Sequence, residues 1–273
     1  RISGAVAFPV FEALVGPVKA VQRFGGDDLK SRILPRVTAG EMQVSVAMSE
    51  PDAGSGLTDL STKATETAEG WELNGHKRWT SGSGHAEGYV VYCRMSEQKG
   101  AKGIGALYVD KDADGVSFGP RENLMGFRGI PTRDLHFDSV AVPKENLIVP
   151  AGGFGKLMEA FDLERCGNAT MSLGVAAGAL EEVLAYVQER KQFGREIVEF
   201  QAVQLRLAEM ATKVEAARLL IHRAASNAEG MPSILDSSIA KCFANEMTRE
   251  VCGAAVQLMG GYGYHKGFGM EQR

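Results

Sequence analysis

The sequence predicts an α+β fold of three parts in chain order: a helical N-terminal part, a middle antiparallel β-barrel or sandwich, and a C-terminal helical bundle. Three observations support this prediction. Apolar residues recur at helical spacing near the start of the chain, short β-rich runs follow from Val44, and long helical patterns begin after residues 150–153 (Pro-Ala-Gly-Gly). We therefore expect domain boundaries of 1–42, 43–149 and 150–273.

The N-terminal part is expected to be the end of a helical domain. Apolar residues between positions 11 and 21 are spaced three or four apart, which places them on one face of a helix. Asp27 or Asp28 is a candidate N-cap, because a carboxylate accepts hydrogen bonds from the free N–H groups of a first helical turn. This cap predicts a second helix around residues 29–37.

The middle part has the pattern of an antiparallel sheet. Gly, Asp and Pro separate several runs that are rich in β-branched and aromatic residues. The expected strands include residues 43–48, 70–79, 89–94, 105–109, 116–118 and 134–140. Asn74-Gly75 is a strong hairpin signal, because both residues tolerate positive φ, so we expect a tight turn there.

The C-terminal part is expected to be a set of packed helices. A helix from about Gln201 has apolar residues at alternating spacings of four and three, as in an antiparallel bundle. Its seam residues are Val203, Leu207, Met210, Val214, Ala217 and Ile221. A third helix opens after Pro232 and ends at Gly260-Gly261, where glycine suits a helix C-terminus. Its expected apolar stripe is Ile239, Phe243, Met247, Val251, Ala254 and Leu258.

Composition and charge argue against several classes of function. The 273 residues carry 30 Lys+Arg and 34 Asp+Glu, a formal net charge of −4, which disfavours binding to nucleic-acid phosphates. No continuous apolar run approaches the roughly 18 residues of a membrane-spanning helix. The cysteines and histidines show no metal-ligand spacing, so we expect no metal site.

One segment has the composition of a ligand-binding turn. Residues 46–55 (Val-Ala-Met-Ser-Glu-Pro-Asp-Ala-Gly-Ser) join the end of a strand to a turn that presents backbone N–H groups and two hydroxyls. Such groups suit a ring carbonyl or phosphate oxygens. From the residues alone, an ordinary turn fits at least as well. Gly82-Ser83-Gly84 followed by Gly88 does not complete a dinucleotide-binding glycine motif, so a Rossmann domain is not supported.

Six blocks in a fixed order favour the ligand-binding interpretation. They are residues 46–55, 77–82 (Lys-Arg-Trp-Thr-Ser-Gly), 124–128 (Leu-Met-Gly-Phe-Arg), 161–165 (Phe-Asp-Leu-Glu-Arg), 189–194 (Glu-Arg-Lys-Gln-Phe-Gly) and 257–263 (Gln-Leu-Met-Gly-Gly-Tyr-Gly). In type and order these blocks resemble the FAD-dependent acyl-CoA dehydrogenase family. The resemblance implies the family fold of a helical, a β and a second helical domain. It also implies that most of the N-terminal helical domain and the C-terminal end lie outside this sequence.

The resemblance implies dehydrogenation of an acyl-CoA thioester to the trans-2-enoyl-CoA. In the family a carboxylate removes the α-proton while hydride leaves Cβ for the flavin. Glu164 matches the position of the alternative base that some branches use. The family's usual base follows the Gly260-Gly261 turn and would fall outside this sequence. Both assignments of the base remain open.

The resemblance also implies which residues hold the cofactor and the substrate. For FAD the matching residues are Met48, Ser49, Ser55, Trp79, Ser81, Arg190, Gln192, Phe193, Gln257, Gly260 and Gly261. For the CoA moiety they are Ser55, Phe161, Asp162 and Arg165, of which the last three could instead have ordinary structural roles. Because several of the FAD residues would reach the cofactor of a neighbouring subunit, a homo-oligomer, either a dimer or a tetramer, is expected.

The implied electron acceptor is an electron-transferring flavoprotein. Two other functions are also compatible with the sequence. One is a related flavoenzyme that acts on acyl-CoA without net oxidation or reacts its flavin with oxygen, and the other is a catalytically silent flavoprotein that serves as an assembly partner. The expected location is the bacterial cytoplasm, or the mitochondrial matrix in a eukaryote, with no nucleic-acid or membrane partner.

Overall fold

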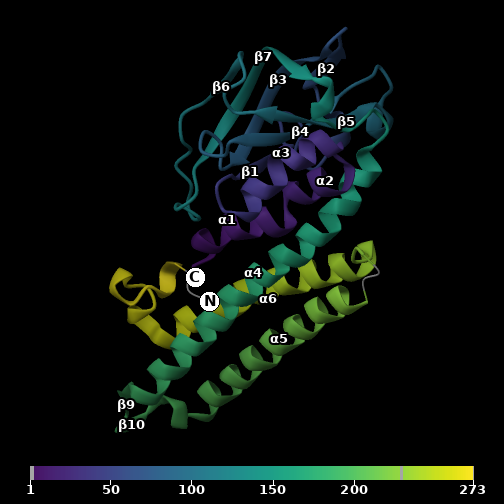
Figure 1. Cartoon of the computed structure of the whole chain (residues 1–273). Helices are drawn as coiled ribbons and strands as arrows, with labels where there is room; N and C mark the ends of the chain where they lie inside the picture. The colour runs from purple at the N-terminus through teal and green to yellow at the C-terminus, as the bar shows by residue number, and fades with distance from the viewer. Residues whose placement is uncertain (1–2, 228–229, 273) are drawn as a thin grey trace. The chain divides into compact units, whose positions relative to one another are not determined.

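The computed structural model describes residues 3–227 and 230–272, and the chain divides into two compact units. Phe8–Phe161 form the unit that contains the sheet, and Asp162–Arg273 with the first seven residues form a helical unit. The division falls inside one long helix, α4 (Phe154–Glu189). The order of elements, helical then β then helical, confirms the expected fold class (Figure 1).

Three helices precede the sheet: α1 (Gly4–Val15), α2 (Pro17–Phe24) and α3 (Asp27–Thr38). The expected cap of α3 is wrong, because its N-cap is Gly26 and no side chain caps the helix there. Asp27 and Asp28 lie instead in the first turn, where their negative charge interacts favourably with the positive end of the helix dipole.

Eight strands form one mixed sheet in the order β6-β7-β3-β2-β4-β5-β8, with β1 beside β4. Their bounds are β1 (Val44–Ala47), β2 (Lys63–Glu66), β3 (Gly70–Ser81), β4 (Gly88–Arg94), β5 (Ile104–Asp110), β6 (Val116–Phe118), β7 (Thr132–Pro143) and β8 (Leu147–Val149). Most pairs are antiparallel, as expected. The parallel pairing of β1 and β2 with β4 was not expected from the sequence. It arises because the chain reverses through β3 before it returns as β4.

The expected hairpin at Asn74-Gly75 is wrong, because both residues lie inside the continuous strand β3. The register of β3 against β7 shifts between Leu73 and Gly75, so the sheet has a β-bulge at this point. On β7 the bulge includes Ser139, whose φ is +50. The side-chain oxygen of Asn74 accepts a hydrogen bond of 2.8 Å from the Ser139 N–H. Asn74, which was expected to form a turn, therefore stabilises a bulge in the sheet.

The sheet separates two cores. Alternate residues of β4 point to opposite sides, so Val90 and Tyr92 belong to one core and Tyr89 and Val91 to the other. The first core is closed by α2 and α3, which supply Val18, Ala20, Val21, Leu29, Ile33 and Val37. The second core consists of residues from the strands and their connections, including Leu73, Leu107, Leu135, Phe137, Val140 and Val142.

The helical unit packs α4 against α5 (Gln201–Ser226) and α6 (Ile234–Met259) (Figure 1). The seam of α5 is confirmed from Leu207 to the end of the helix. On α6 the expectation is partly wrong, because Ile239 and Phe243 are exposed. The buried stripe of α6 is Ser237, Ala240, Ala244, Met247, Val251, Ala254, Ala255 and Met259, whose small residues allow close helix packing.

Two helical segments, Gly4–Phe24 and Phe154–Glu189, are long and apolar enough by length and composition to pass for membrane spans. The sequence did not predict them, because polar residues interrupt the apolar runs in both segments. The core helix of a soluble protein meets the same criterion. In α4 the residues Ala169, Ala176 and Val183 are buried in the helical core. Packing in the helical core therefore accounts for part of the apolar character of α4, since 39% of its most apolar stretch is buried.

Candidate functional site

The turn after β1 contains the first group of expected cofactor residues. Met48 and Ser49 follow the strand directly and are half-buried, whereas Ser55 lies further along the turn and is exposed. The Met48 carbonyl accepts a hydrogen bond of 2.9 Å from the Lys77 side chain, and the Ser49 carbonyl accepts one of 2.8 Å from the Arg78 N–H. These two bonds attach the turn to β3.

Trp79 occupies an irregular position in β3. The register against β7 shifts between Lys77 and Thr80, so β3 contains one extra residue there. Trp79 has a φ of +61, which is rare for a bulky residue, and its side chain is 51% exposed. Strained backbone of this kind clusters at ligand sites, where the surrounding structure maintains it. The bulge leaves the indole ring accessible and places Ser81 at the end of the strand.

Gly82 follows Ser81 and ends the block of residues 77–82. In the structure its φ is +76, and an added Cβ would lie 2.5 Å from the hydroxyl of Ser45 on β1. Its N–H donates a 2.8 Å hydrogen bond to the Pro131 carbonyl. The need for glycine here therefore comes from close packing inside the sheet unit.

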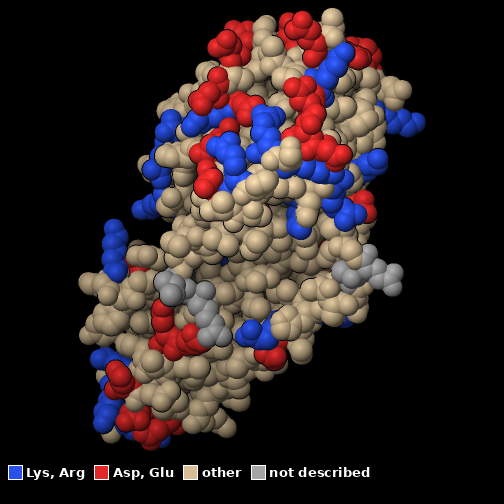
Figure 2. Space-filling model, viewed as in Figure 1, with Lys and Arg blue, Asp and Glu red and all other residues tan. Residues whose placement is uncertain are grey.

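A charged cluster surrounds the side chain of Arg78. Its guanidinium lies 2.7 Å from Asp134 and 3.2 Å from Glu122. His76, Asp134 and His136 also gather there, with potential ligand atoms within 4.8 Å of one another, although their spacing in the sequence gave no metal signal. The Arg78 cation already neutralises Asp134 and would repel a metal ion. More widely, Figure 2 shows basic and acidic side chains interleaved on the visible face of the sheet unit.

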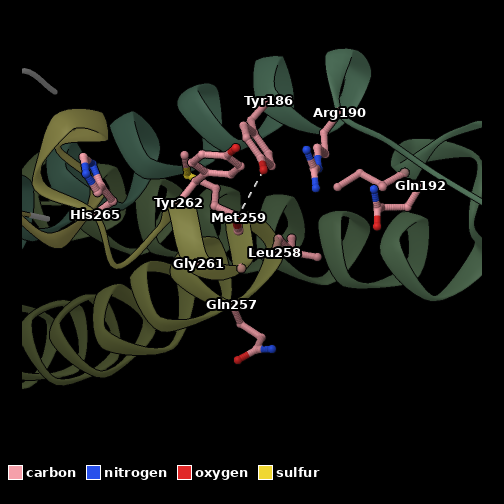
Figure 3. Close-up of a pocket in the computed structure, with 11 residues that line it drawn as sticks. Tyr186, Arg190, Gln192, Gln257, Leu258, Met259, Gly261, Tyr262 and His265 are labelled. Atoms are coloured by element: carbon pink, nitrogen blue, oxygen red, sulfur yellow. Dashed lines mark hydrogen bonds between the residues drawn. The ribbon is translucent and has the colours of Figure 1, made fainter.

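The helical unit contains a pocket of about 470 Å³ between the end of α4 and the end of α6 (Figure 3). Its lining residues are Tyr186, Arg190, Gln192, Ile197, Gln257, Leu258, Met259, Gly260, Gly261, Tyr262 and His265. The guanidinium carbon of Arg190 lies 5.6 Å from the Tyr262 ring centre, and the Tyr186 hydroxyl donates to the Met259 carbonyl at 3.3 Å. Five of the expected FAD residues therefore line one pocket, although Gln257 points away from Arg190.

Phe193 stands outside the lining of this pocket, at the tip of a short hairpin. The strands β9 (Lys191–Gln192) and β10 (Arg195–Glu196) pair in antiparallel register around Phe193 and Gly194. Both tip residues have positive φ, +54 and +79, as a tight hairpin turn requires. The Phe193 side chain is 94% exposed. Like Trp79, it combines an exposed aromatic ring with a left-handed backbone.

Glu164 lies on α4 and is half-buried. Burial raises the pKa of its carboxyl to about 7, although the positive charges of Lys241 and Arg165 act in the opposite direction. A carboxylate with a pKa near 7 can accept a proton at neutral pH, which suits a general base.

Asp162 and Arg165 form an ion pair one helical turn apart on α4. The Asp162 side chain is only 2% exposed and also accepts a 3.3 Å hydrogen bond from the Ser237 hydroxyl. Asp162 therefore orients Arg165, whereas the guanidinium is the better placed of the two to meet an anionic ligand. Phe161 precedes them and is half-buried.

Sequence reasoning missed three aromatic residues of the pocket and one ion pair of the sheet unit. Tyr186, Tyr262 and His265 line the pocket, yet of these only Tyr262 lies in one of the six blocks, residues 257–263. Lys77 and Glu50 form a buried pair although they are distant in sequence. Their presence in two separate blocks was the only available signal.

Matches to family models cover most of the chain. Residues 45–140 match the model described as acyl-CoA dehydrogenase, middle domain, and residues 151–273 match the model of the C-terminal domain of the same family. The two models fall on the sheet and on the long helices, respectively.

Among relatives, a probable acyl-CoA dehydrogenase FadE25 of Mycobacterium tuberculosis is 40% identical over 251 residues, which are 91% of this chain and 64% of the relative. The chain thus spans less than two thirds of that protein. A caffeyl-CoA reductase-Etf complex subunit, CarC of Acetobacterium woodii, is 39% identical over 91% of this chain and 66% of its own length. The solved structure of butyryl-CoA dehydrogenase from Megasphaera elsdenii has a TM-score of 0.95 and 31% identity, covering 99% of this chain and 71% of its own.

Proposed function

This chain belongs to the acyl-CoA dehydrogenase family, and from that premise we propose that it forms the FAD-binding and catalytic part of an enzyme that dehydrogenates an acyl-CoA thioester. The product would be the trans-2-enoyl-CoA. The observation that carries the proposal is the pocket in which Arg190, Gln192, Gln257, Gly260 and Gly261 come together.

The residues of the helical pocket fit one half of a dinucleotide. Its volume of about 470 Å³ lies within the roughly 300–1,000 Å³ of ligand sites. Arg190 supplies a positive charge for a diphosphate, and Tyr262 supplies an aromatic surface for a base. Gly260 and Gly261 have no atom within 4 Å of an added Cβ, so a ligand could approach their backbone closely. Phe193 would extend the aromatic surface from the hairpin tip.

The sheet unit would hold the flavin end of FAD. Trp79 would pack against the ring, Ser81 and the Ser49 hydroxyl would form hydrogen bonds, and Met48 would present its backbone. Ser55 would lie near the diphosphate or the CoA arm. When bound, FAD would accept the hydride that leaves Cβ of the substrate.

Glu164 would remove the α-proton. Its carboxylate is the form that accepts this proton, so the reaction needs Glu164 to be ionised. The pKa of about 7 means that this form is available at neutral pH while its basicity stays higher than that of an ordinary glutamate. Arg165, oriented by Asp162, would pair with an anionic group of CoA, and Phe161 would contact the same moiety.

Two macromolecular partners belong to the proposal. An electron-transferring flavoprotein would take the electrons, in line with the name of the CarC relative as a subunit of an Etf complex. A second copy of the chain would complete each FAD site, since the resemblance assigns the helical pocket to the cofactor of a neighbouring subunit. The compared relatives come from bacteria, which supports a bacterial cytoplasmic location.

The name of the CarC relative also favours a second candidate function, the reverse reaction. A reductase on the same scaffold would saturate the Cα–Cβ bond of an enoyl-CoA with electrons received from a flavoprotein. The same residues serve both directions, because a group that removes the α-proton in one direction returns it in the other.

The test is an anaerobic titration of the full-length protein, loaded with FAD, with a panel of saturated CoA thioesters. Loss of the visible flavin absorption on addition of one thioester would support dehydrogenation. A dithionite-reduced protein that regains its colour with an enoyl-CoA would favour the reductase. No colour change with any thioester in either direction would contradict both functions. Rapid reoxidation in air with release of peroxide would point to an oxidase.

A further inference from the structure

We propose that the buried ion pair of Glu50 and Lys77 positions the turn of Met48 and Ser49 as part of the flavin site. The inference rests on the proposed function, because it assigns the turn to FAD. In this proposal Glu50 and Lys77 are positioning residues, which act through the turn and do not touch the reacting atoms.

The pair is almost completely removed from solvent. The Lys77 ammonium lies 2.8 Å from the Glu50 carboxylate, and the two side chains are 0% and 2% exposed. Charged side chains are rarely buried to this degree unless they are paired. Two such groups cost free energy to desolvate, so the protein keeps them only with a dense set of hydrogen bonds.

Glu50 has such a set. One carboxylate oxygen accepts hydrogen bonds from the Ser61 N–H at 2.7 Å and the Ser61 hydroxyl at 2.6 Å. The other accepts from the Thr62 N–H at 2.9 Å and from Lys77. Lys77 in turn donates to the Met48 carbonyl at 2.9 Å. The network therefore joins the turn after β1, residues 61–62 and strand β3.

The charge state agrees with this network. Burial alone would raise the pKa of Glu50, but the Lys77 ammonium and the hydrogen bonds lower it to about 2. Burial lowers the pKa of Lys77, and the Glu50 charge partly opposes that shift. Glu50 is thus ionised throughout the neutral range.

One hydrogen bond from the Lys77 side chain and several backbone bonds attach the turn and give it its shape. The Met48 carbonyl bonds to Lys77, the Ser49 carbonyl bonds to the Arg78 N–H, and Glu50 and Ala53 exchange two backbone hydrogen bonds. Each of these bonds has a fixed direction, which an apolar contact does not have. An ion pair here therefore specifies the orientation of the turn, whereas two apolar residues would fill the space without orienting it.

The test compares four forms of the full-length protein. Wild type, Lys77→Met, Glu50→Gln and the double variant Glu50→Leu/Lys77→Met are measured for thermal stability and for the dissociation constant of FAD. Hydrogen exchange of the peptide that covers residues 48–56 follows the turn itself without FAD. Lys77→Met leaves Glu50 buried without its partner and is expected to lower thermal stability strongly.

The double variant is the decisive form. The double variant removes both buried charges, so we expect it to fold with a melting temperature above that of Lys77→Met but below that of wild type, because the Thr62 N–H and the Met48 carbonyl lose their partners. We also expect FAD to bind at least about tenfold more weakly and the 48–56 amides to exchange faster, because the Met48 carbonyl has lost its bond from Lys77 and residue 50 its bonds from Ser61 and Thr62. A folded double variant with wild-type FAD affinity and wild-type exchange would overturn the inference.

Two further outcomes are decisive as well. If Glu50→Gln and the double variant both fail to fold, the pair serves global stability, and the positioning role is wrong. If wild type itself binds no FAD, both the proposed function and this inference are wrong. The titration of wild type with FAD distinguishes this outcome from the others. Arg32→Met is the control, because its ion pair with Asp110 lies in the same unit but is partly exposed. It should leave both FAD affinity and exchange of the turn unchanged.

Discussion

The guanidinium carbon of Arg78 lies 4.2 Å from the ring centre of its neighbour Trp79. Asp134 and Glu122 hold the guanidinium in this place with ion pairs of 2.7 and 3.2 Å. A cation thus lies against the aromatic ring that we propose to meet the flavin, and it helps to fix the orientation of that ring.

Arg78→Met is expected to weaken FAD binding about two- to fivefold, because a cation–π contact at an exposed site is worth about 0.5–1 kcal/mol. The measurement is quenching of Trp79 fluorescence by FAD in a Trp71→Phe background, since the chain has 2 Trp residues. Arg121→Met, which removes an exposed arginine outside this cluster, is the control. Equal FAD affinities of Arg78→Met and its parent would contradict the prediction.

Glu164→Gln is expected to lower the rate of flavin reduction by about 10²- to 10⁴-fold, the usual contribution of a general base. In wild type, kcat/KM should rise with pH through about 7, since the carboxyl must lose its proton to act. Rapid-mixing kinetics between pH 5.5 and 8.5 measure both effects, because this range extends about 1.5 pH units to each side of the pKa. Glu159→Gln, at an exposed position of the same helix, should keep full activity. Full activity of Glu164→Gln would move the role of base to another carboxylate.

The same pKa predicts how stability depends on pH. Because the folded protein holds the Glu164 proton more tightly than the unfolded chain, this group stabilises the fold below its ordinary pKa of 4.5. That contribution is lost as the pH rises through about 7. Glu164→Gln should therefore be more stable than wild type at pH 8, a pH above the folded-state pKa, and much closer to it at pH 4.5. Urea unfolding at the two pH values measures the difference in stability between wild type and Glu164→Gln. The same difference at both pH values would contradict the raised pKa of Glu164.

Gly260→Ala is expected to destabilise the protein by about 1–3 kcal/mol. Gly260 ends α6 with φ +58 and ψ −136, a conformation open to glycine and costly for other residues. An added Cβ would meet no atom within 4 Å at either Gly260 or Gly261, so the cost is purely conformational. Gly261→Ala is therefore the matched control and should melt close to wild type in differential scanning calorimetry. Equal melting temperatures of the two variants would contradict the argument.

Arg190→Met is expected to weaken FAD binding about tenfold or more, because a charge-assisted hydrogen bond to a phosphate is worth about 1.5–3 kcal/mol. The Arg190 guanidinium lies in the helical pocket near Tyr262. Isothermal titration calorimetry with FAD measures the change. Arg223→Met, which breaks an ion pair with Asp236 in the same unit, is the control for the loss of a positive charge. If Arg190→Met bound FAD with unchanged affinity, the proposal that this pocket holds the diphosphate would be wrong.

The sequence predicted best the features that depend on local periodicity. The seam of α5, the start of α6 after Ser233 and its end at Gly260 agree with the structure, because spacing, caps and glycine act over a few residues. The expectation at Asn74-Gly75 was wrong because the same residues serve a turn or a bulge, and pairing with β7 decides between them.

At the candidate site, too, the sequence predicted some features and only the structure showed others. The ordered blocks named Arg190, Gln192, Gln257, Gly260 and Gly261, and the structure brings them to one pocket. For Asp162 the resemblance implied a contact with the CoA moiety, whereas its buried bonds to Arg165 and Ser237 indicate that it orients the arginine.

The sequence by itself determined the order of the elements, the family to which the chain is similar and the residue types at the candidate site. Only the tertiary structure decided that Glu50 and Lys77 share a buried ion pair, that Arg78 lies against Trp79, and that burial raises the pKa of Glu164. The physical reason is that burial and charge pairing depend on segments brought together by strand register and helix packing. No local pattern in the sequence encodes those distances.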